Sequence, residues 1–325
     1  MAQFDLPLAE LRDYRPEVRE APGFDDFWAR TLEAGPAVTA KEVLLDNRLV
    51  TVDTYDVTFT GFDCAPIKAW LHVPAGTVAP LPTVVCYRGH SESRGMPLSA
   101  VYAAAGYAHF VMDSRGQGWS AGNLFGGTAD HHTDAGTFGP PGPMTKGIES
   151  AESYYYRRLI TDAVRLLQHV ASHPLVDPTR IFVAGGSQGG YMAIAVAGLA
   201  PTLGIPLAGA LPDVAFMCNI RRGVELTDSQ PYSLVAQFLA AAPHLEDKVW
   251  DTLSHFDGVS FARRAICPGY FSVALSDVVC PPSTVFTAYN AWGGDKDIEV
   301  YPYNNHEGGG DVQAWKQLGW LANRR

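Results

Sequence analysis

The sequence Gly-Gly-Ser-Gln-Gly-Gly at residues 185–190 constrains the fold more than any other part of the chain. It follows an apolar run typical of a buried strand, residues 180–185, and precedes one typical of a buried helix, residues 191–200. A Gly-x-Ser-x-Gly sequence between a strand and a helix forms a sharp turn that exposes the serine at the end of the strand. The glycines permit a strained backbone and close packing of helix on strand. The pattern therefore predicts that Ser187 is a nucleophile.

The rest of the chain alternates segments typical of strands and of helices. Residues 39–73 alternate polar and apolar side chains, which favours an antiparallel start. Later strands are expected as short apolar runs at residues 82–87, 107–113, 207–211, 269–275 and 298–303. Helices are expected at residues 24–32, 97–105, 153–172, 191–200, 232–256, 283–292 and 311–323. The alternation, without repeat or flexible linker, predicts a single α/β domain over residues 1–325. Its sheet is doubly wound and mostly parallel, with antiparallel N-terminal strands and helices on both faces.

Two segments stand apart from this alternation. Residues 1–35 predict an N-terminal arm followed by a short helix. Residues from about 116 to 150 are rich in glycine and proline and have no clear period. A long irregular stretch in a compact domain is usually a lid, a binding loop or an interface. We therefore expect a loop excursion near the active site, and a candidate oligomer interface.

The bulk composition is that of an ordinary globular protein and argues against several function classes. The 325 residues carry 24 basic and 34 acidic side chains, a formal charge of −10, without a basic stripe that would indicate a nucleic-acid partner. No apolar run reaches transmembrane length, and the N-terminus lacks the basic and apolar regions of a signal peptide. The five cysteines form an odd, scattered set without Cys-x-x-Cys, which favours a reduced, cytoplasmic compartment: Cys64, Cys86, Cys218, Cys267 and Cys280.

A serine nucleophile needs a base, and the base needs a group that orients it. In α/β-hydrolases these follow in the chain order serine, acid, histidine. Asp277 comes directly after a buried-type strand, and His306 follows the next strand, so both are expected at the carboxyl ends of strands. We predict Ser187 as nucleophile, His306 as general base and Asp277 as its orienting acid. Competing candidates for the acid are Asp213, Asp257 and Asp295.

Acyl transfer also needs donors for the developing oxyanion. One is expected to be the backbone N–H of Gln188, directly after the nucleophile. The other is expected in the loop that begins at Tyr87, and we choose the Tyr87 backbone N–H. His90 in this loop is a candidate pocket residue, since the chain order excludes it as base. Trp119 and Phe125 are candidates for lining an acyl or sugar pocket.

Three rival functions remain open at this point. One is another α/β-hydrolase, an esterase or peptidase with a different acyl or acceptor preference. A second is a catalytically silent scaffold. The third is a zinc deacetylase using the adjacent His131 and His132. Adjacent histidines project in different directions and no other ligand set has a recognisable spacing, so we predict no metal and no cofactor.

Three motifs in this order resemble the signatures of carbohydrate esterase family 7, the acetyl xylan esterases and cephalosporin C deacetylases. They are Arg-Gly-Gln at residues 115–117, Gly-x-Ser-Gln-Gly at residues 185–189 and His-Glu at residues 306–307. Residues 4–8, 14–16 and 24–28 look like the family's N-terminal segment, and residues 276–284 look like its acid loop. The resemblance covers nearly the whole chain.

The resemblance implies a triad of Ser187, Asp277 and His306, with oxyanion amides from Tyr87 and Gln188. It implies that Arg115, Gly116 and Gln117 form a structural motif near the site, bracing loops beneath it. It further implies a cytoplasmic serine esterase without a cofactor that removes acetyl groups from small acetylated sugars, and often from cephalosporin C. Family members usually assemble as homo-hexamers whose active sites face an internal cavity, and the loop after Gln117 fits their interface excursion.

The first oxyanion loop departs from the family pattern. The resemblance leads us to expect Tyr-His-Gly-Tyr, whereas residues 87–90 read Tyr-Arg-Gly-His. Backbone donors survive such a change, so catalysis is expected to survive as well. Arg88 and His90 are the residues expected to alter the charge of the pocket and its substrate preference.

Overall fold

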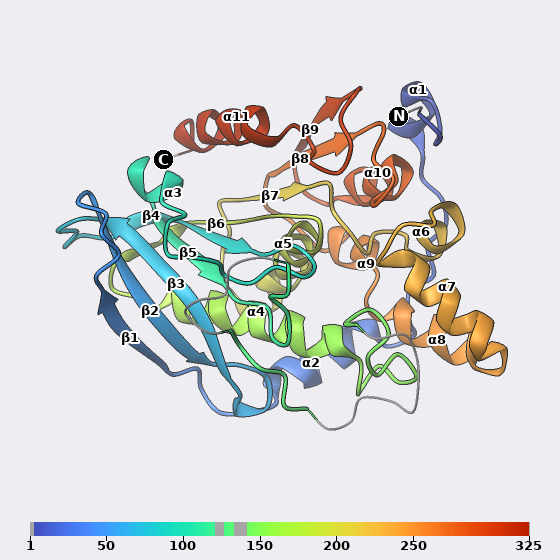
Figure 1. Cartoon of the computed structure of the whole chain (residues 1–325), viewed down its shortest axis with the longest axis horizontal. Coiled ribbons are helices and arrows are strands. Elements are labelled where there is room, and N and C mark those ends of the chain that lie inside the picture. Colours follow the sequence, from blue (N-terminus) through green and yellow to red (C-terminus); the bar gives the residue numbers. More distant parts are fainter. Residues whose placement is uncertain (1–2, 121–126, 133–141, 325) are drawn as a thin grey trace.

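The computed structural model describes residues 3–120, 127–132 and 142–324, and its centre is one nine-stranded sheet (Figure 1). The strands lie in the order β1-β2-β3-β5-β4-β6-β7-β8-β9. Pairing is antiparallel from β1 to β5 and parallel from β5 to β9. The bounds are β1 Ala40–Leu45, β2 Val52–Thr60, β3 Pro66–Pro74, β4 Leu81–Tyr87, β5 Ala108–Met112, β6 Val176–Gly186, β7 Gly209–Asp213, β8 Gly269–Ala274 and β9 Lys296–Tyr301.

Helices cover both faces of the parallel part of the sheet (Figure 1). Successive side chains of β6 point to opposite faces, so Val183 joins the larger core cluster while Phe182 joins a smaller one. The smaller cluster contains residues of α3 (Val101–Ala104) and α11 (Gly310–Ala322). The larger one contains residues of α2 (Phe24–Glu33), α4 (Tyr155–Ala171), α5 (Gln188–Leu199), α9 (Gly258–Ala262) and α10 (Pro282–Ala291). The predicted fold class is confirmed.

The remaining helices border this framework. They are α1 (Leu8–Asp13), α6 (Ile220–Leu226), α7 (Tyr232–Ala241) and α8 (Glu246–Ser254), with 3₁₀ turns at η1 (Phe62–Cys64), η2 (Ala200–Leu203) and η3 (Pro243–Leu245). The helical region expected at residues 232–256 is therefore two helices, because Pro243 lacks the N–H that a continuous helix would use. The helix α6 was not predicted, because its central Gly223 weakens the helical signal in the sequence. A Cβ at Gly223 would lie 2.6 Å from the Tyr232 ring.

A buried carboxylate helps to hold the N-terminal arm against the body of the protein. The Asp5 side chain is 1% exposed, accepts the Ser283 N–H at 2.7 Å and pairs with Arg222 at 3.0 Å. These contacts place the arm beside α6 and α10. Further along, the helix predicted at residues 24–32 is present as α2, and its Phe27 and Trp28 side chains are buried in the core. Whether residues 1–325 form a single folding domain stays a prediction.

The loop excursion predicted at about residues 116–150 is irregular in its described parts, residues 116–120, 127–132 and 142–150, which contain neither helix nor strand. Asp130 anchors it through ion pairs with Lys146 at 2.7 Å and Arg158 at 2.9 Å. Its role as an oligomer interface stays a prediction.

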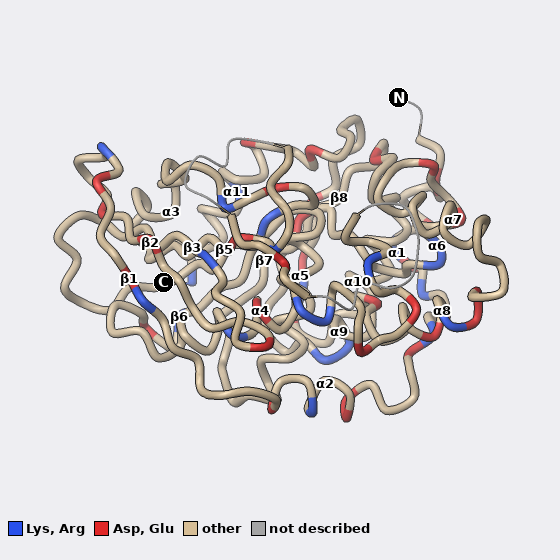
Figure 2. Tube along the Cα trace, turned by 60° about the horizontal axis from the view of Figure 1, so that its bottom comes forward, with Lys and Arg blue, Asp and Glu red and all other residues tan. Residues whose placement is uncertain are grey.

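Charged residues of both signs are interspersed along the described chain (Figure 2). Among the described residues, no helix combines the length and apolar character that crossing a bilayer requires.

Candidate active site

Ser187 occupies a strained turn between β6 and α5. Its backbone has φ 56° and ψ −118°, a left-handed conformation that is rare for residues other than glycine. Three backbone hydrogen bonds hold it there. The Ser187 N–H donates to the Asp213 carbonyl at 2.9 Å, and the Ser187 carbonyl accepts the N–H groups of Tyr191 at 2.9 Å and Phe216 at 3.0 Å. The predicted sharp turn is thus present, at the carboxyl end of β6, where a serine hydroxyl is exposed to a ligand.

The glycines around Ser187 permit contacts that a side chain would block. A Cβ at Gly189 would lie 2.2 Å from the Tyr87 carbonyl oxygen, and one at Gly185 would lie 2.5 Å from the Gly189 backbone. A Cβ at Gly186, by contrast, would meet nothing within 4 Å. Gly185 and Gly189 therefore allow α5 and the end of β4 to approach the turn closely.

Asp277 and His306, far apart in the sequence, lie together next to this turn. The Nδ1 atom of His306 is 2.9 Å from Oδ2 of Asp277. Asp277 is 1% exposed, and its Oδ1 accepts the backbone N–H groups of Val279 at 2.8 Å and Cys280 at 2.9 Å. The turn after β8 therefore fixes the carboxylate and leaves one oxygen for the imidazole. An aspartate in this position holds Nδ1 protonated and Nε2 free to take a proton.

The loop that carries His306 turns sharply before α11. Gly308, Gly309 and Gly310 all have positive φ, at 55°, 94° and 49°. At Gly309 a Cβ would lie 2.3 Å from the Tyr301 ring, so the turn also needs the absence of a side chain there. The backbone therefore turns tightly after the histidine.

Ser187 and His306 line the same cleft, which has a volume of about 340 Å³. Tyr87, Arg88 and Gly89 of the loop after β4 form one of its walls. The Tyr87 ring is buried and its hydroxyl donates to the Ala163 carbonyl, so only its backbone is available to a ligand. The cleft is completed by Cys86, Glu92, Tyr102, Ala184, Gly185, Gly186, Asp213, Val214, Glu307 and Gln317.

A buried amide network supports the turn and the loop after β4. The Gln117 side-chain amide donates to Oε1 of Gln188 at 2.9 Å, and its oxygen accepts the Ser91 N–H at 2.7 Å. Tyr156 donates to the same Gln188 oxygen at 3.1 Å. The Gln188 side chain is fully buried, and its backbone N–H lies at the start of α5, directly after Ser187. Gln117 thus joins the two segments predicted to supply oxyanion donors.

Arg115 lies deeper and holds the surrounding elements together. Its guanidinium forms a two-pronged pair with Asp162 at 2.6 and 2.7 Å and reaches Asp130 at 3.5 Å. Gly116 has φ 66° and donates its N–H to the Thr128 carbonyl. Asp162 and Asp130 raise the pKa of the buried Arg115 guanidinium against the opposing effect of its burial, so it stays charged. These contacts join the motif to α4 and to the loop around Asp130, and its role in bracing the site stays a prediction.

The competing acids occupy other positions. Asp257 caps α9 and accepts the backbone N–H groups of Asn219, Ile220 and Val259. Asp213 lines the cleft and accepts hydrogen bonds from two glutamines of α11, Gln313 at 3.0 Å and Gln317 at 2.7 Å. Burial raises the pKa of Asp213 to about 6, although the hydrogen bonds from the two glutamines lower it. The structure thus brings Asp277 to His306.

Comparison with known proteins identifies the family. The family model for acetyl xylan esterase (AXE1) matches residues 1–324. The chain belongs to the acetyl xylan esterase family.

The most similar proteins include acetyl esterases. The acetyl esterase Axe7A of Xylanibacter ruminicola is 26% identical over 321 residues, which cover 94% of this chain and 68% of that protein. An acetyl xylan esterase structure from Paenibacillus sp. R4 matches with a TM-score of 0.91 at 36% identity, covering 98% of this chain and 100% of that one. Acetyl xylan esterase 1 from Thermoanaerobacterium sp. JW/SL YS485 matches with a TM-score of 0.85 at 30% identity, covering 98% and 99%. The chain is accordingly a carboxylic ester hydrolase with the α/β-hydrolase fold.

Within this esterase, the four residues proposed for the substrate pocket lie in different places. Arg88 lines the cleft and pairs with Glu92 at 3.1 Å. His90 and Trp119 pack edge to face, with ring centroids 5.5 Å apart. Phe125 lies outside the described residues. The parts played by His90 and Trp119 in substrate binding stay predictions.

Sequence reasoning missed several residues that line the esterase cleft, among them Glu92, Asp213, Glu307 and Gln317. Glu307 could have been proposed as a cleft residue because it belongs to the His-Glu motif. Asp213 was considered only as a rival for the acid that orients the histidine. Gln317 lies on the last helix, and no local pattern signals that one of its glutamines faces the cleft.

Proposed function

We propose that this esterase removes acetyl groups from small acetylated substrates, foremost acetylated xylo-oligosaccharides, through an acetyl-enzyme intermediate. The observation that carries the proposal is the 2.9 Å contact of Asp277 with His306 beside a cleft that His306 shares with Ser187. The family of the chain supports the choice of acetyl ester.

Acylation begins with proton transfer from the Ser187 hydroxyl to Nε2 of His306 as the serine oxygen attacks the acetyl carbonyl carbon. Asp277 keeps the proton on Nδ1 of His306 and stabilises the imidazolium that forms. The bond to the alcohol then breaks, and His306 returns its proton to the departing sugar oxygen. The acetyl group remains on Ser187.

The tetrahedral intermediate carries a negative oxygen that needs donors in place beforehand. We assign these to the backbone N–H groups of Tyr87 and Gln188. The position of Gln188 at the start of α5 adds the positive end of the helix dipole. The amide network through Gln117 supports this assignment because it holds both segments rigidly.

Deacylation repeats these steps with water as the nucleophile. His306 takes a proton from water, the hydroxide oxygen attacks the acetyl carbonyl, and the Ser187 oxygen leaves with the proton from His306. Acetate is released and the serine is restored. No cofactor enters any step.

The size of the cleft supports a short acyl group. Its volume of about 340 Å³ is near the lower end of the range for small-molecule sites. Cephalosporin C, also an acetyl ester, is a second candidate substrate by resemblance, and Arg88 and His90 are the residues we expect to decide between acceptors.

Assembly and location complete the proposal. All five cysteines have free thiols, which supports a reducing, cytoplasmic location. A homo-hexamer, by family resemblance, is the proposed assembly, and the exposed Trp119 in the irregular loop supports a partner contact there.

An acyl-chain panel tests the proposal. We expect p-nitrophenyl acetate to be hydrolysed with the highest kcat/KM, with a drop of at least about tenfold at butyrate, because each added methylene must fit a small cleft. His306→Ala should abolish turnover, while His244→Ala, an exposed histidine of η3, serves as the matched control. Higher activity on long acyl esters or on N-acylated amino-acid amides would favour the rival esterase or peptidase.

A further inference from the structure

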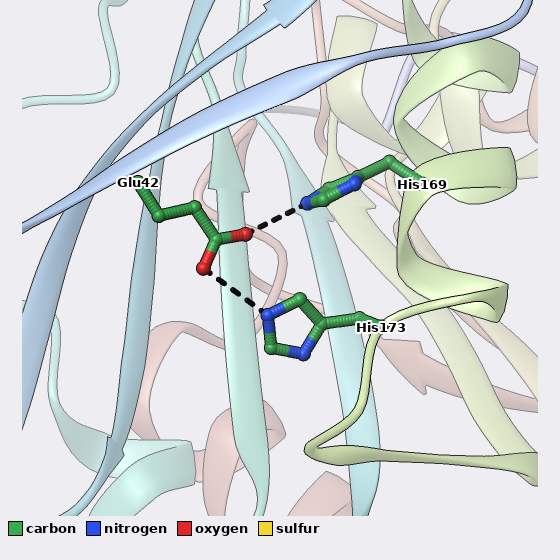
Figure 3. A group of neighbouring side chains, drawn as sticks. All are labelled: Glu42, His169 and His173. Carbon is green, nitrogen blue, oxygen red and sulfur yellow. Dashed lines mark hydrogen bonds and ion pairs between the residues drawn. The ribbon is translucent and has the colours of Figure 1, made fainter.

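Three side chains with metal-binding atoms meet outside the cleft that Ser187 and His306 line. The Glu42 carboxylate of β1 lies between two imidazole rings, with Oε1 2.9 Å from Nε2 of His169 and Oε2 3.2 Å from Nε2 of His173 (Figure 3). His169 is in the last turn of α4, and His173 lies four residues later, just beyond the end of the helix. Two histidines at this spacing present their rings on the same side.

The cluster is sheltered and its rings are held by packing. The side chains of His169, His173 and Glu42 are 15%, 6% and 23% exposed. The Phe110 ring packs edge-on against both imidazoles, with centroids 6.1 Å from His169 and 5.7 Å from His173. Fixed rings reduce the conformational entropy that a ligand would have to remove.

We propose that Glu42, His169 and His173 form a binding site for a divalent transition metal ion, zinc being the best match. Two imidazoles and one carboxylate are a ligand set that zinc uses, whereas magnesium and calcium prefer oxygen ligands alone. The three ligand atoms lie within 4.8 Å of one another. Tetrahedral zinc requires ligand atoms about 3.3 Å apart, so small side-chain rotations suffice. Among the described residues, no other group of three such side chains meets this condition.

A hollow beside the cluster gives an ion access and leaves room for a fourth ligand. It has a volume of about 390 Å³ and is lined by His169 together with Arg165, Gln168 and Ser172. Water from this hollow would complete four-coordination, since the protein supplies three ligands.

Metal binding has a defined consequence for the protons of the cluster. The Leu175 N–H donates to Nδ1 of His173 at 3.2 Å, so neutral His173 carries its proton on Nε2 and donates it to Glu42. Coordination through Nε2 moves that proton to Nδ1 by way of solvent, and the bond from Leu175 is then lost. The Leu175 amide is therefore a local reporter of zinc at His173.

The bound ion would cross-link the edge strand β1 to the C-terminal end of α4. Within the part of the chain that the structure describes, β1 pairs only with β2, and Glu42 is its contact with these histidines. The site does not depend on the esterase mechanism, and it differs from the zinc deacetylase rival, which would use His131 and His132.

Zinc titration of untagged, chelator-treated protein by calorimetry tests the proposal. We expect one ion per chain, and a loss of affinity of at least about tenfold in His169→Gln and in His173→Gln. Glutamine keeps a donor for Glu42 but is a poor zinc ligand, so the fold should persist, as circular dichroism without metal would verify. His244→Ala should bind zinc like the wild type.

Two further readouts make the test specific. Cobalt in place of zinc should give the strong visible absorption of a four-coordinate site, and His169→Gln should abolish it. The amide resonance of Leu175 should shift with the first equivalent of zinc. Absence of zinc binding by the wild type, or equal binding by His169→Gln and His173→Gln, would overturn the proposal.

Discussion

At the scale of single residues, two aspartates near Ser187 have different hydrogen-bond partners. Asp277 receives two backbone N–H groups and an imidazole, all suited to a carboxylate. Asp213 receives only neutral side-chain donors in a largely enclosed place, so burial dominates and raises its pKa to about 6. The carboxyl group of Asp213, at the edge of the cleft, therefore has a pKa above that of an ordinary aspartate.

The raised pKa of Asp213 predicts that part of the unfolding free energy depends on pH, and that Asp213→Asn removes this part. A carboxyl with a higher pKa in the folded chain favours folding at low pH, and that contribution is lost as the pH rises from about 4 to about 6. Because Asp213 is partly open to the cleft, we expect the wild type to lose about 1–2 kcal/mol of unfolding free energy relative to Asp213→Asn over this window. Urea unfolding of both proteins across the pH range measures it. A difference that stays constant would contradict the assigned environment.

The sequence was sufficient to place the central residues of the site. The order of Ser187, Asp277 and His306, each after a strand-like run, predicted that they would meet, and the structure brings Asp277 to His306 beside the serine turn. Their catalytic roles stay predictions. Glu92 and Gln317 could not be predicted, because their positions in the cleft depend on tertiary packing of a loop and the last helix.

At the scale of elements, the serine turn depends on how closely α5 approaches the strands. Gly185 and Gly189 allow backbone contacts with Tyr87 that no other residue permits, while Gly186 faces open space. The five-residue motif at 185–189 therefore contains two glycines that have no room for a side chain and one, Gly186, that has room for one.

Alanine substitution should affect stability and activity at a glycine without room for a side chain, and should have little effect at Gly186. In Gly189→Ala the new methyl group meets the Tyr87 carbonyl, so we expect a loss of about 1–3 kcal/mol or more of unfolding free energy and of most esterase activity. Gly186→Ala is the matched control and should change stability by less than about 1 kcal/mol. Thermal unfolding and p-nitrophenyl acetate turnover measure both effects. Equal effects of the two substitutions would show that the close approach is not what the turn requires.

The strands and long helices could be predicted from the sequence, whereas the residues at which they begin and end were predicted less accurately. The strands β4, β5 and β8 could be predicted from their continuous apolar runs, which arise because helices cover both faces of the sheet there. The helix expected at residues 97–105 is reduced to α3, which ends before Gly106 with φ 87°. β6 starts at Val176, before the apolar run, because Val176 already pairs with Leu81 of β4; the register then shifts, and regular pairing resumes at Ile181.

At the scale of the whole molecule, contacts between distant segments secure the periphery. The N-terminal arm is attached through Asp5 to α6 and α10, and β1 is attached through Glu42 to the end of α4. The sequence analysis identified neither contact. Each joins residues more than a hundred positions apart, although the two histidines at spacing four were visible as a pattern.

Removing the charge of Asp5 should loosen the arm. Asp5→Asn leaves Arg222 without its buried partner, and we expect a loss of about 1–3 kcal/mol of unfolding free energy. Asp13→Asn is the matched control because Asp13 is 90% exposed and lies 3.6 Å from Arg15. Chemical unfolding compares them, and limited proteolysis should cut the arm faster in Asp5→Asn alone. Unchanged stability of Asp5→Asn would mean that the arm is held by its apolar contacts.

The central claim is that Ser187 carries the acetyl group during turnover, and Ser187→Ala tests it most directly. The measurement is kcat/KM on p-nitrophenyl acetate for the wild type, Ser187→Ala and the control His244→Ala, with folding verified by circular dichroism. We predict a fall of about 10⁴-fold or more for Ser187→Ala and no significant change for His244→Ala. Retention of more than about a tenth of the wild-type value by folded Ser187→Ala would contradict the mechanism.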